Sequence, residues 1–159
     1  MIPAITPECI IWVVLTVYFE AVGEPPSGQK AVVKVILNRA VRNKWPLTDI
    51  VKARKQFSCW NDGPQGPIKT NPIKPVQLVR VHLTGLQGLQ EWINGARLRG
   101  ATHFYSPKAM IPAYSVPWWV PSMTFIAELY GHRFYREGPE PDWNQPLVTY
   151  DTYFDHLSM

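Results

Sequence analysis

The stretch TVYFEAVGEPPSGQKAVVKVILNRAVR, residues 16 to 42, decides how this chain folds. Its first part is apolar, Gly23 and two consecutive prolines interrupt it, and apolar residues return at helical spacing after Ser27. Glycine ends helices readily and proline cannot continue one, so we predict two helices joined by a tight turn, the second capped by Ser27. The turn places two carboxylates, Glu20 and Glu24, four residues apart.

Glu20 is the residue of this turn that best fits catalysis. The helix before it is predicted to begin at Thr6-Pro7 and is apolar nearly all round, which places it in the core. A carboxylate at the end of a core helix is partly desolvated, and desolvation raises its pKa, to about 6 in well-studied enzymes. Such a group can donate a proton and take one back, so we predict a general acid/base. An ion pair with Arg39 is the structural alternative.

Two further helical stretches follow. Residues 47–55 are predicted to form a short basic helix capped by Thr48. Residues 76–94 are predicted to form one or two helices, because Gly85 and Gly88 weaken the middle of the stretch. The apolar residues expected to face inward on this last stretch are Val79, Leu83, Leu86, Leu89 and Ile93.

Two short aromatic segments, ATHFY at 101–105 and GHRFY at 131–135, have the composition of strands and are predicted to pair. With the helices before them they predict a mostly α, α+β fold with a small antiparallel β-hairpin. The length of 159 residues fits a single domain spanning 1–159. The acidic and aromatic tail, 137–159, is expected to wrap around that domain.

The composition is that of a globular, mildly basic protein. Hydrophobic residues make up 46% and charged residues 18% of the chain, and the net charge is +4. Residues 30–55 hold eight Lys or Arg against one acidic residue, Asp49, so we expect this region to contact an anionic envelope surface. No nucleic-acid-binding motif accompanies these charges, so we expect no nucleic-acid partner, and we expect a monomer.

Other chemistries lack a signature in this chain. The four histidines are scattered, with no HExxH and no cysteine pairs at zinc spacing, so we expect neither a metal nor another cofactor. A Cys-His hydrolase would need Cys59 beside His103 or His132, and a serine triad lacks its GxSxG turn. Cys9 and Cys59 make no disulfide framework, and whether they pair stays open. A carboxylate facing aromatic loops remains, as in enzymes that cleave glycans.

Several motifs resemble the family of cell wall hydrolases that includes the spore-cortex lytic enzyme SleB and its relative CwlJ. The similarity covers residues 12–136 in the same order. The most specific motif is EAVGEP at 20–25, followed by Gly28-Gln29, Ala31-Val32 and VILNR at 35–39. The later blocks are QFS at 56–58, ATHFY at 101–105 and GHRFY at 131–135.

The resemblance implies a lysozyme-like fold and cleavage of the MurNAc–GlcNAc backbone of peptidoglycan, as a lytic transglycosylase. Glu20 would protonate the glycosidic oxygen and then deprotonate the MurNAc C6 hydroxyl, which closes an anhydro ring on C1. We expect Glu24 either to accept hydrogen bonds from backbone amides or to touch the substrate. Aromatic rings stack on sugars, and polar groups bind their oxygens. The predicted substrate-binding residues are Glu24, Gln56, Phe57, Ser58, His103, Tyr105 and Trp118.

Three alternatives stay open at this point. A muramidase would add water instead of the C6 hydroxyl. An amidase would cut the bond between MurNAc and the stem peptide, and normally uses zinc. A non-enzymatic module would bind peptidoglycan without cleaving it.

The sequence shows neither a recognisable export signal nor a separate wall-binding domain, which is typical of bacteriophage endolysins. We therefore expect synthesis in the cytoplasm of a host bacterium. The protein would reach the wall in the periplasm after a holin opens the membrane.

Overall fold

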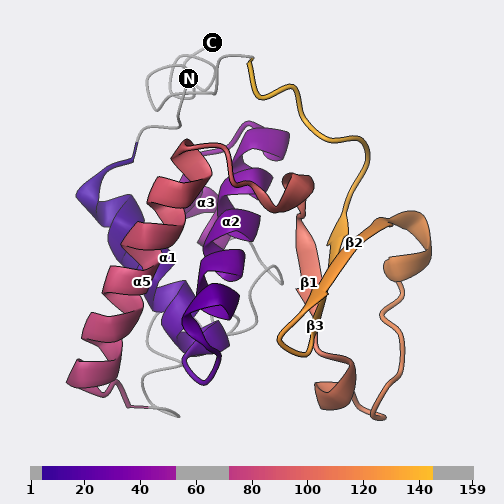
Figure 1. The fold of residues 1–159 in the computed structure, drawn as a ribbon, viewed down its shortest axis with the longest axis horizontal. Helices are drawn as coiled ribbons and strands as arrows, with labels where there is room; N and C mark the ends of the chain where they lie inside the picture. The colour runs from indigo at the N-terminus through magenta and orange to yellow at the C-terminus, as the bar shows by residue number, and fades with distance from the viewer. Residues whose placement is uncertain (1–4, 53–71, 145–159) are drawn as a thin grey trace.

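A computed structural model describes residues 5–52 and 72–144, and its helices and strands form two layers (Figure 1). The helices are α1 (Pro7–Ala21), α2 (Pro26–Asn43), α3 (Leu47–Lys52) and α5 (Pro75–Ile93). The strands are β1 (His103–Tyr105), β2 (Thr124–Leu129) and β3 (His132–Arg136). The helices gather on one side of the molecule and the small sheet on the other. The predicted mostly α, α+β class is confirmed.

The first helix begins as predicted and the next two begin differently. The Thr6 hydroxyl accepts a hydrogen bond from the Cys9 amide at 3.2 Å, which is the predicted N-cap. The Ser27 cap is wrong: proline occupies the first position of α2, and Ser27 already lies inside the helix. The Thr48 cap is wrong for a similar reason, because α3 starts at Leu47, and Thr48 is buried with its hydroxyl 3.3 Å from the Cys9 sulfur.

Helix α2 lies between the two layers and contributes to both hydrophobic clusters. Val32, Val33 and Ile36 pack among the buried residues of α1, α3 and α5. Ala31 and Val35 pack against the sheet side, in a second cluster with Phe134, Ile126 and Ala101. An amphipathic helix buries one face, whereas α2 buries nearly all of its surface between Gly28 and Ala40. It is therefore the element against which the helices and the sheet are placed.

Helix α5 is one continuous helix, and it buries a different face from the one we predicted. Its buried residues are Val81, Thr84, Gly85, Gly88 and Trp92. The prediction that Val79, Leu83 and Leu86 face inward is wrong, since all three are exposed, while Leu89 and Ile93 do pack on the core. The physical reason is close packing: a Cβ placed on Gly88 would lie 3.2 Å from the Lys30 Cα. The small residues let α5 approach α2, and the large ones are left outside.

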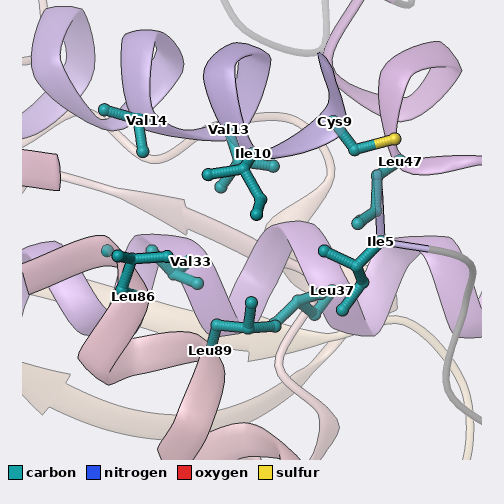
Figure 2. A pocket seen from close by; sticks show the side chains of 11 residues that line it. Ile5, Cys9, Ile10, Val13, Val14, Val33, Leu37, Leu47, Leu86 and Leu89 are labelled. Carbon is teal, nitrogen blue, oxygen red and sulfur yellow. The ribbon is translucent and has the colours of Figure 1, made fainter. Parts of the chain in front are cut away.

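The two glycines of α5 give a matched pair of stability predictions. A methyl group at Gly85 would meet only the Val14 Cγ2, at 3.4 Å, beside an apolar pocket between α1, α2 and α5 (Figure 2). We expect Gly85→Ala to raise the free energy of unfolding by about 0.5–1 kcal/mol, because alanine favours the helix. A methyl group at Gly88 would meet the α2 backbone, so we expect Gly88→Ala to lower it by about 1–3 kcal/mol.

Urea unfolding of both variants at one pH checks these two values. Shifts of the same sign in the two variants would contradict the packing account, because helix propensity alone favours alanine at both positions.

The sheet has three antiparallel strands in the order β1-β3-β2. The predicted pairing of the two aromatic segments is confirmed, with Phe104 opposite Phe134. Strand β2 was not predicted. It forms a hairpin with β3 through Tyr130 and Gly131, and both residues have positive φ, as a two-residue type I′ turn requires. The sheet buries Phe104, Phe134 and Ile126 toward α2.

The first residues of the C-terminal tail return to the helical layer. Trp143 meets Trp92 edge-on, with ring centroids 6.1 Å apart, and the Arg97 guanidinium lies 4.8 Å from each ring. The predicted wrapping of 137–159 otherwise stays a prediction, because residues 145–159 lie outside the described part of the chain.

Candidate active site

The turn between α1 and α2 holds both carboxylates of the candidate site, and Gln29 fixes its shape. The buried Gln29 side-chain amide donates to the carbonyl oxygens of Ala21 and Glu24, each at 3.2 Å, and lies 3.5 Å from that of Val22. The last carbonyls of a helix have no partner within it, and a buried amide from the next helix supplies one here. The turn is therefore held by hydrogen bonds as well as by its two prolines.

Glu20 lies in the last turn of α1 and its side chain is partly buried. It interacts electrostatically with Arg39, a buried cation on α2. Burial lowers the pKa of Arg39 to about 10, and the negative charges of Glu20 and Glu137 oppose that change. The site thus combines a half-buried carboxylate with a buried guanidinium, where Coulombic attraction is stronger than in water.

Arg39 and its neighbour Asn38 join α2 to the chain that enters β1. The Arg39 Nε donates to the Thr102 carbonyl oxygen. The Asn38 amide nitrogen donates to the carbonyl oxygens of Arg97 and Ala101, both at 2.9 Å, and its oxygen accepts from the Trp92 indole at 2.9 Å. These bonds give the pair a structural role, and they bring the start of β1 to the helix face that carries Arg39.

Among residues 5–52 and 72–144, no backbone amide hydrogen-bonds to the Glu24 carboxylate, so the expected contact is not found there. A Glu24 carboxylate oxygen instead lies 3.6 Å from the Nδ1 of His132, the first residue of β3. A Cβ on Gly28 would lie 3.2 Å from the Glu24 Cβ and 3.7 Å from Tyr130, so the hairpin turn packs directly over the helix turn. The contact is made by residues more than 100 positions apart in the chain, which local patterns do not reveal. Contact of Glu24 with substrate stays a prediction.

His103 lies on the sheet near Arg39 and is neutral at pH 7. Burial and the positive charges of Arg39 and Arg42 together lower the pKa of His103 to about 4, against an opposing effect of the Glu137 charge. Its Nδ1 lies 2.9 Å from the Thr102 hydroxyl, which also accepts the Glu137 amide at 3.0 Å. A neutral imidazole can donate from one nitrogen and accept at the other, as binding of sugar hydroxyls requires.

The aromatic residues predicted to line a groove are placed differently from one another. Tyr105 is buried and stacks on Tyr135, with centroids 6.1 Å apart, while Trp119 meets both rings. Burial and a side-chain hydrogen bond with Tyr105 raise the pKa of Tyr135. Trp118 is 90% exposed and belongs to no such cluster. The sequence analysis did not include Trp119 and Tyr135 among the site residues. Side chains two positions apart on a strand share a face, so Tyr135 could have been placed on the same face of β3 as Arg133.

Three of the predicted substrate-binding residues, Gln56, Phe57 and Ser58, lie outside the described residues.

Within residues 5–52 and 72–144, no three His, Cys, Asp or Glu side chains gather in a way that could hold a metal ion. In the same ranges, no helix has the length and apolar character needed to cross a membrane. The apolar pocket of Figure 2 lies among α1, α2 and α5, and no charged residue lines it, so it offers no group for acid/base catalysis.

Within residues 30–52, the described part of the basic region, four cations face acidic groups or rings of the same chain. Glu91 accepts contacts from Lys30 and Lys34 at 3.4 and 3.8 Å. Arg42 lies 3.3 Å from Glu137, and Lys52 lies 4.1 Å from the centre of the Trp12 ring. Contact of residues 30–55 with an anionic surface therefore stays a prediction, and the region is less free than its sequence indicates.

Among solved structures, the chain matches the catalytic domain of the germination-specific lytic transglycosylase SleB from Bacillus anthracis. The TM-score is 0.58 at 23% sequence identity, and the match covers 84% of this chain and 98% of that domain. The chain therefore has the fold of that catalytic domain. No curated sequence matches the chain.

Residues 23–135 match the Cell Wall Hydrolase family, and because this is more than half of the chain, the protein belongs to that family. The resemblance stated from the sequence motifs is confirmed. The matched segment starts at Gly23, so it contains Glu24 and His103 and begins just after Glu20. The coarse function that follows is degradation of the bacterial cell wall, a peptidoglycan polymer.

Proposed function

We propose that the protein is a lytic transglycosylase that cleaves the MurNAc–GlcNAc bond of peptidoglycan with Glu20 as its one catalytic carboxylate. The observation that carries the proposal is the position of Glu20, half-buried at the end of a core helix and attracted by the buried Arg39. Arg39 also donates to the Thr102 carbonyl oxygen, so it links the surroundings of this carboxylate to the segment that enters β1, the strand of His103 and Tyr105. The similar SleB catalytic domain is called a lytic transglycosylase, which supports the same reaction here.

The reaction needs one group that first gives and then takes a proton. Protonated Glu20 donates to the glycosidic oxygen as the bond between that oxygen and C1 of MurNAc breaks. The resulting carboxylate removes the proton of the MurNAc C6 hydroxyl, and this oxygen bonds to C1 to give the 1,6-anhydro product. The positive charge of Arg39 attracts the carboxylate between the two steps. Glu20 therefore ends the reaction protonated, as it began, and no water is consumed.

The second carboxylate of the turn supports a one-acid mechanism. Glycosidases that add water usually use two carboxylates, placed on either side of the scissile bond. Glu24 is directed instead to His132 on the hairpin, at 3.6 Å. Its role in the proposal is to hold the hairpin over the turn, and His103 and Tyr105 supply polar and aromatic contacts to the sugars.

Mass spectrometry of digested sacculi tests the proposal, because the possible products differ in mass. We expect glycan fragments that end in anhydro-MurNAc, which are lighter by one water molecule than the reducing ends left by a muramidase. Free stem peptides would identify an amidase. Intact sacculi that retain bound protein would identify a binding module, and any of these three results would overturn the transglycosylase proposal.

A bacteriophage endolysin role, with action in the periplasm after holin release, stays part of this proposal. We expect cells that express the protein in the cytoplasm to remain intact until chloroform permeabilises the inner membrane, and then to lyse. Lysis without permeabilisation would contradict the dependence on a holin.

A further inference from the structure

Helix α5 carries an exposed apolar stripe, of which Leu86 also lines the pocket of Figure 2. Val76, Val79, Leu83 and Leu86 are 65%, 59%, 57% and 38% exposed, respectively. Their spacing of three and four residues puts them on one side of the helix, over about 15 Å of its length. We call these four residues the α5 stripe. Figure 1 shows α5 in the helical layer, on the side of the molecule away from the sheet.

Within α5 and its N-cap residue, the charged residues before Glu91 are positive. Lys74 and Arg80 are exposed, and neither makes an ion pair with a described residue. The first acidic residue of the helix is Glu91 in its last turn, where Lys30 and Lys34 bind it. An exposed apolar stripe flanked by unpaired cations is the pattern of a helix that lies on an anionic lipid surface.

We propose that α5 docks the protein onto an anionic lipid bilayer, independently of the catalytic proposal. The α5 stripe enters the boundary between headgroups and acyl chains, while Lys74 and Arg80 contact lipid phosphates. The helix lies in the plane of the membrane, as expected where no described helix can span one. The surface differs from the basic region 30–55, whose cations mostly have partners within the chain.

A second copy of the chain fits this face less well. Stable protein interfaces bury roughly 20–30 residues on each side, whereas the stripe offers four apolar side chains on one helix. Pairing two such faces would also bring the positive charges of both copies together, since no acid lies on the helix before Glu91.

Co-sedimentation with vesicles tests the proposal. We expect the protein to bind vesicles of equal parts phosphatidylglycerol and phosphatidylcholine at least about tenfold more tightly than pure phosphatidylcholine vesicles. The double variant Val79→Gln/Leu83→Gln should bind about tenfold or more weakly, because it removes the exposed apolar area. Lys74→Gln/Arg80→Gln should bind about tenfold more weakly and lose most of the salt dependence.

Ile11→Gln is the matched control, since Ile11 is an equally exposed apolar residue (54%) on α1, and this variant should bind like the wild type. Lipid-free sacculi should be cleaved equally by the wild type and Val79→Gln/Leu83→Gln, which separates this proposal from the catalytic one. Three results would overturn it: no binding of wild type to anionic vesicles, an equal loss in Ile11→Gln, or a stripe variant that turns a dimer into a monomer in sedimentation velocity.

Discussion

Replacing Glu20 by glutamine is expected to lower the initial rate of sacculus cleavage by about 10²–10⁴-fold while the protein stays folded. Glutamine keeps the size and a hydrogen-bonding oxygen but can neither donate the proton nor take it back. Because the proposed mechanism routes both proton transfers through this one group, no other carboxylate replaces it. Turbidity of purified sacculi gives the rate, and the unfolding midpoint of the variant shows that the loss is chemical.

Two carboxylates of the same chain make matched controls for this result. Glu8→Gln, in the first turn of α1, should leave the rate unchanged. Glu24→Gln should reduce it less than Glu20→Gln does, because Glu24 acts through its contact with His132. Equal losses at Glu20 and Glu24 would indicate a two-carboxylate hydrolase and contradict the proposed mechanism.

Replacing Asn38 by alanine is expected to lower the free energy of unfolding by about 3–5 kcal/mol, a large part of the total for a domain of this size. Asn38 is fully buried and makes three hydrogen bonds at 2.9 Å to groups from α5 and the segment before β1. Truncation leaves the Trp92 indole and two carbonyl oxygens buried without these partners. Each unsatisfied group costs about 1–3 kcal/mol, and partial relaxation reduces the sum.

Urea unfolding with a fixed pH measures this loss, and Asn43→Ala is the control. Asn43 is the exposed last residue of α2, and its removal should change the free energy of unfolding by less than about 0.5 kcal/mol. A decrease of less than about 1 kcal/mol in the free energy of unfolding of Asn38→Ala would show that the hydrogen bonds of Asn38 do not hold the sheet to the helices.

Local signals in the sequence predicted the helical part of the fold well. Thr6 caps α1 because its hydroxyl needs only a neighbouring amide, three residues on. The glycine and two prolines of the turn separate α1 from α2 because they act on their own backbone. These effects involve residues close in sequence, so the pattern alone was sufficient, and it also placed Glu20 at the end of a core helix.

The face that α5 buries was decided by its neighbours. Periodicity favoured Val79, Leu83 and Leu86 as the inner face, yet the fold buries Gly85 and Gly88 because they allow α5 to approach α1 and α2. The gain from close packing belongs to a pair of helices, so no property of one helix reveals it.

In the candidate site, too, some features follow from local sequence and others from tertiary contacts. The sequence by itself determined the helix–turn–helix, the pairing of the two aromatic segments and the position of Glu20, because each depends on neighbouring residues or on a strong local pattern. Only the tertiary structure decided that Glu24 contacts His132, that Arg39 is buried near Glu20, and that Trp119 rather than Trp118 packs on the sheet. These contacts join residues distant in sequence, and their free energy exists only once the helices and the sheet have come together.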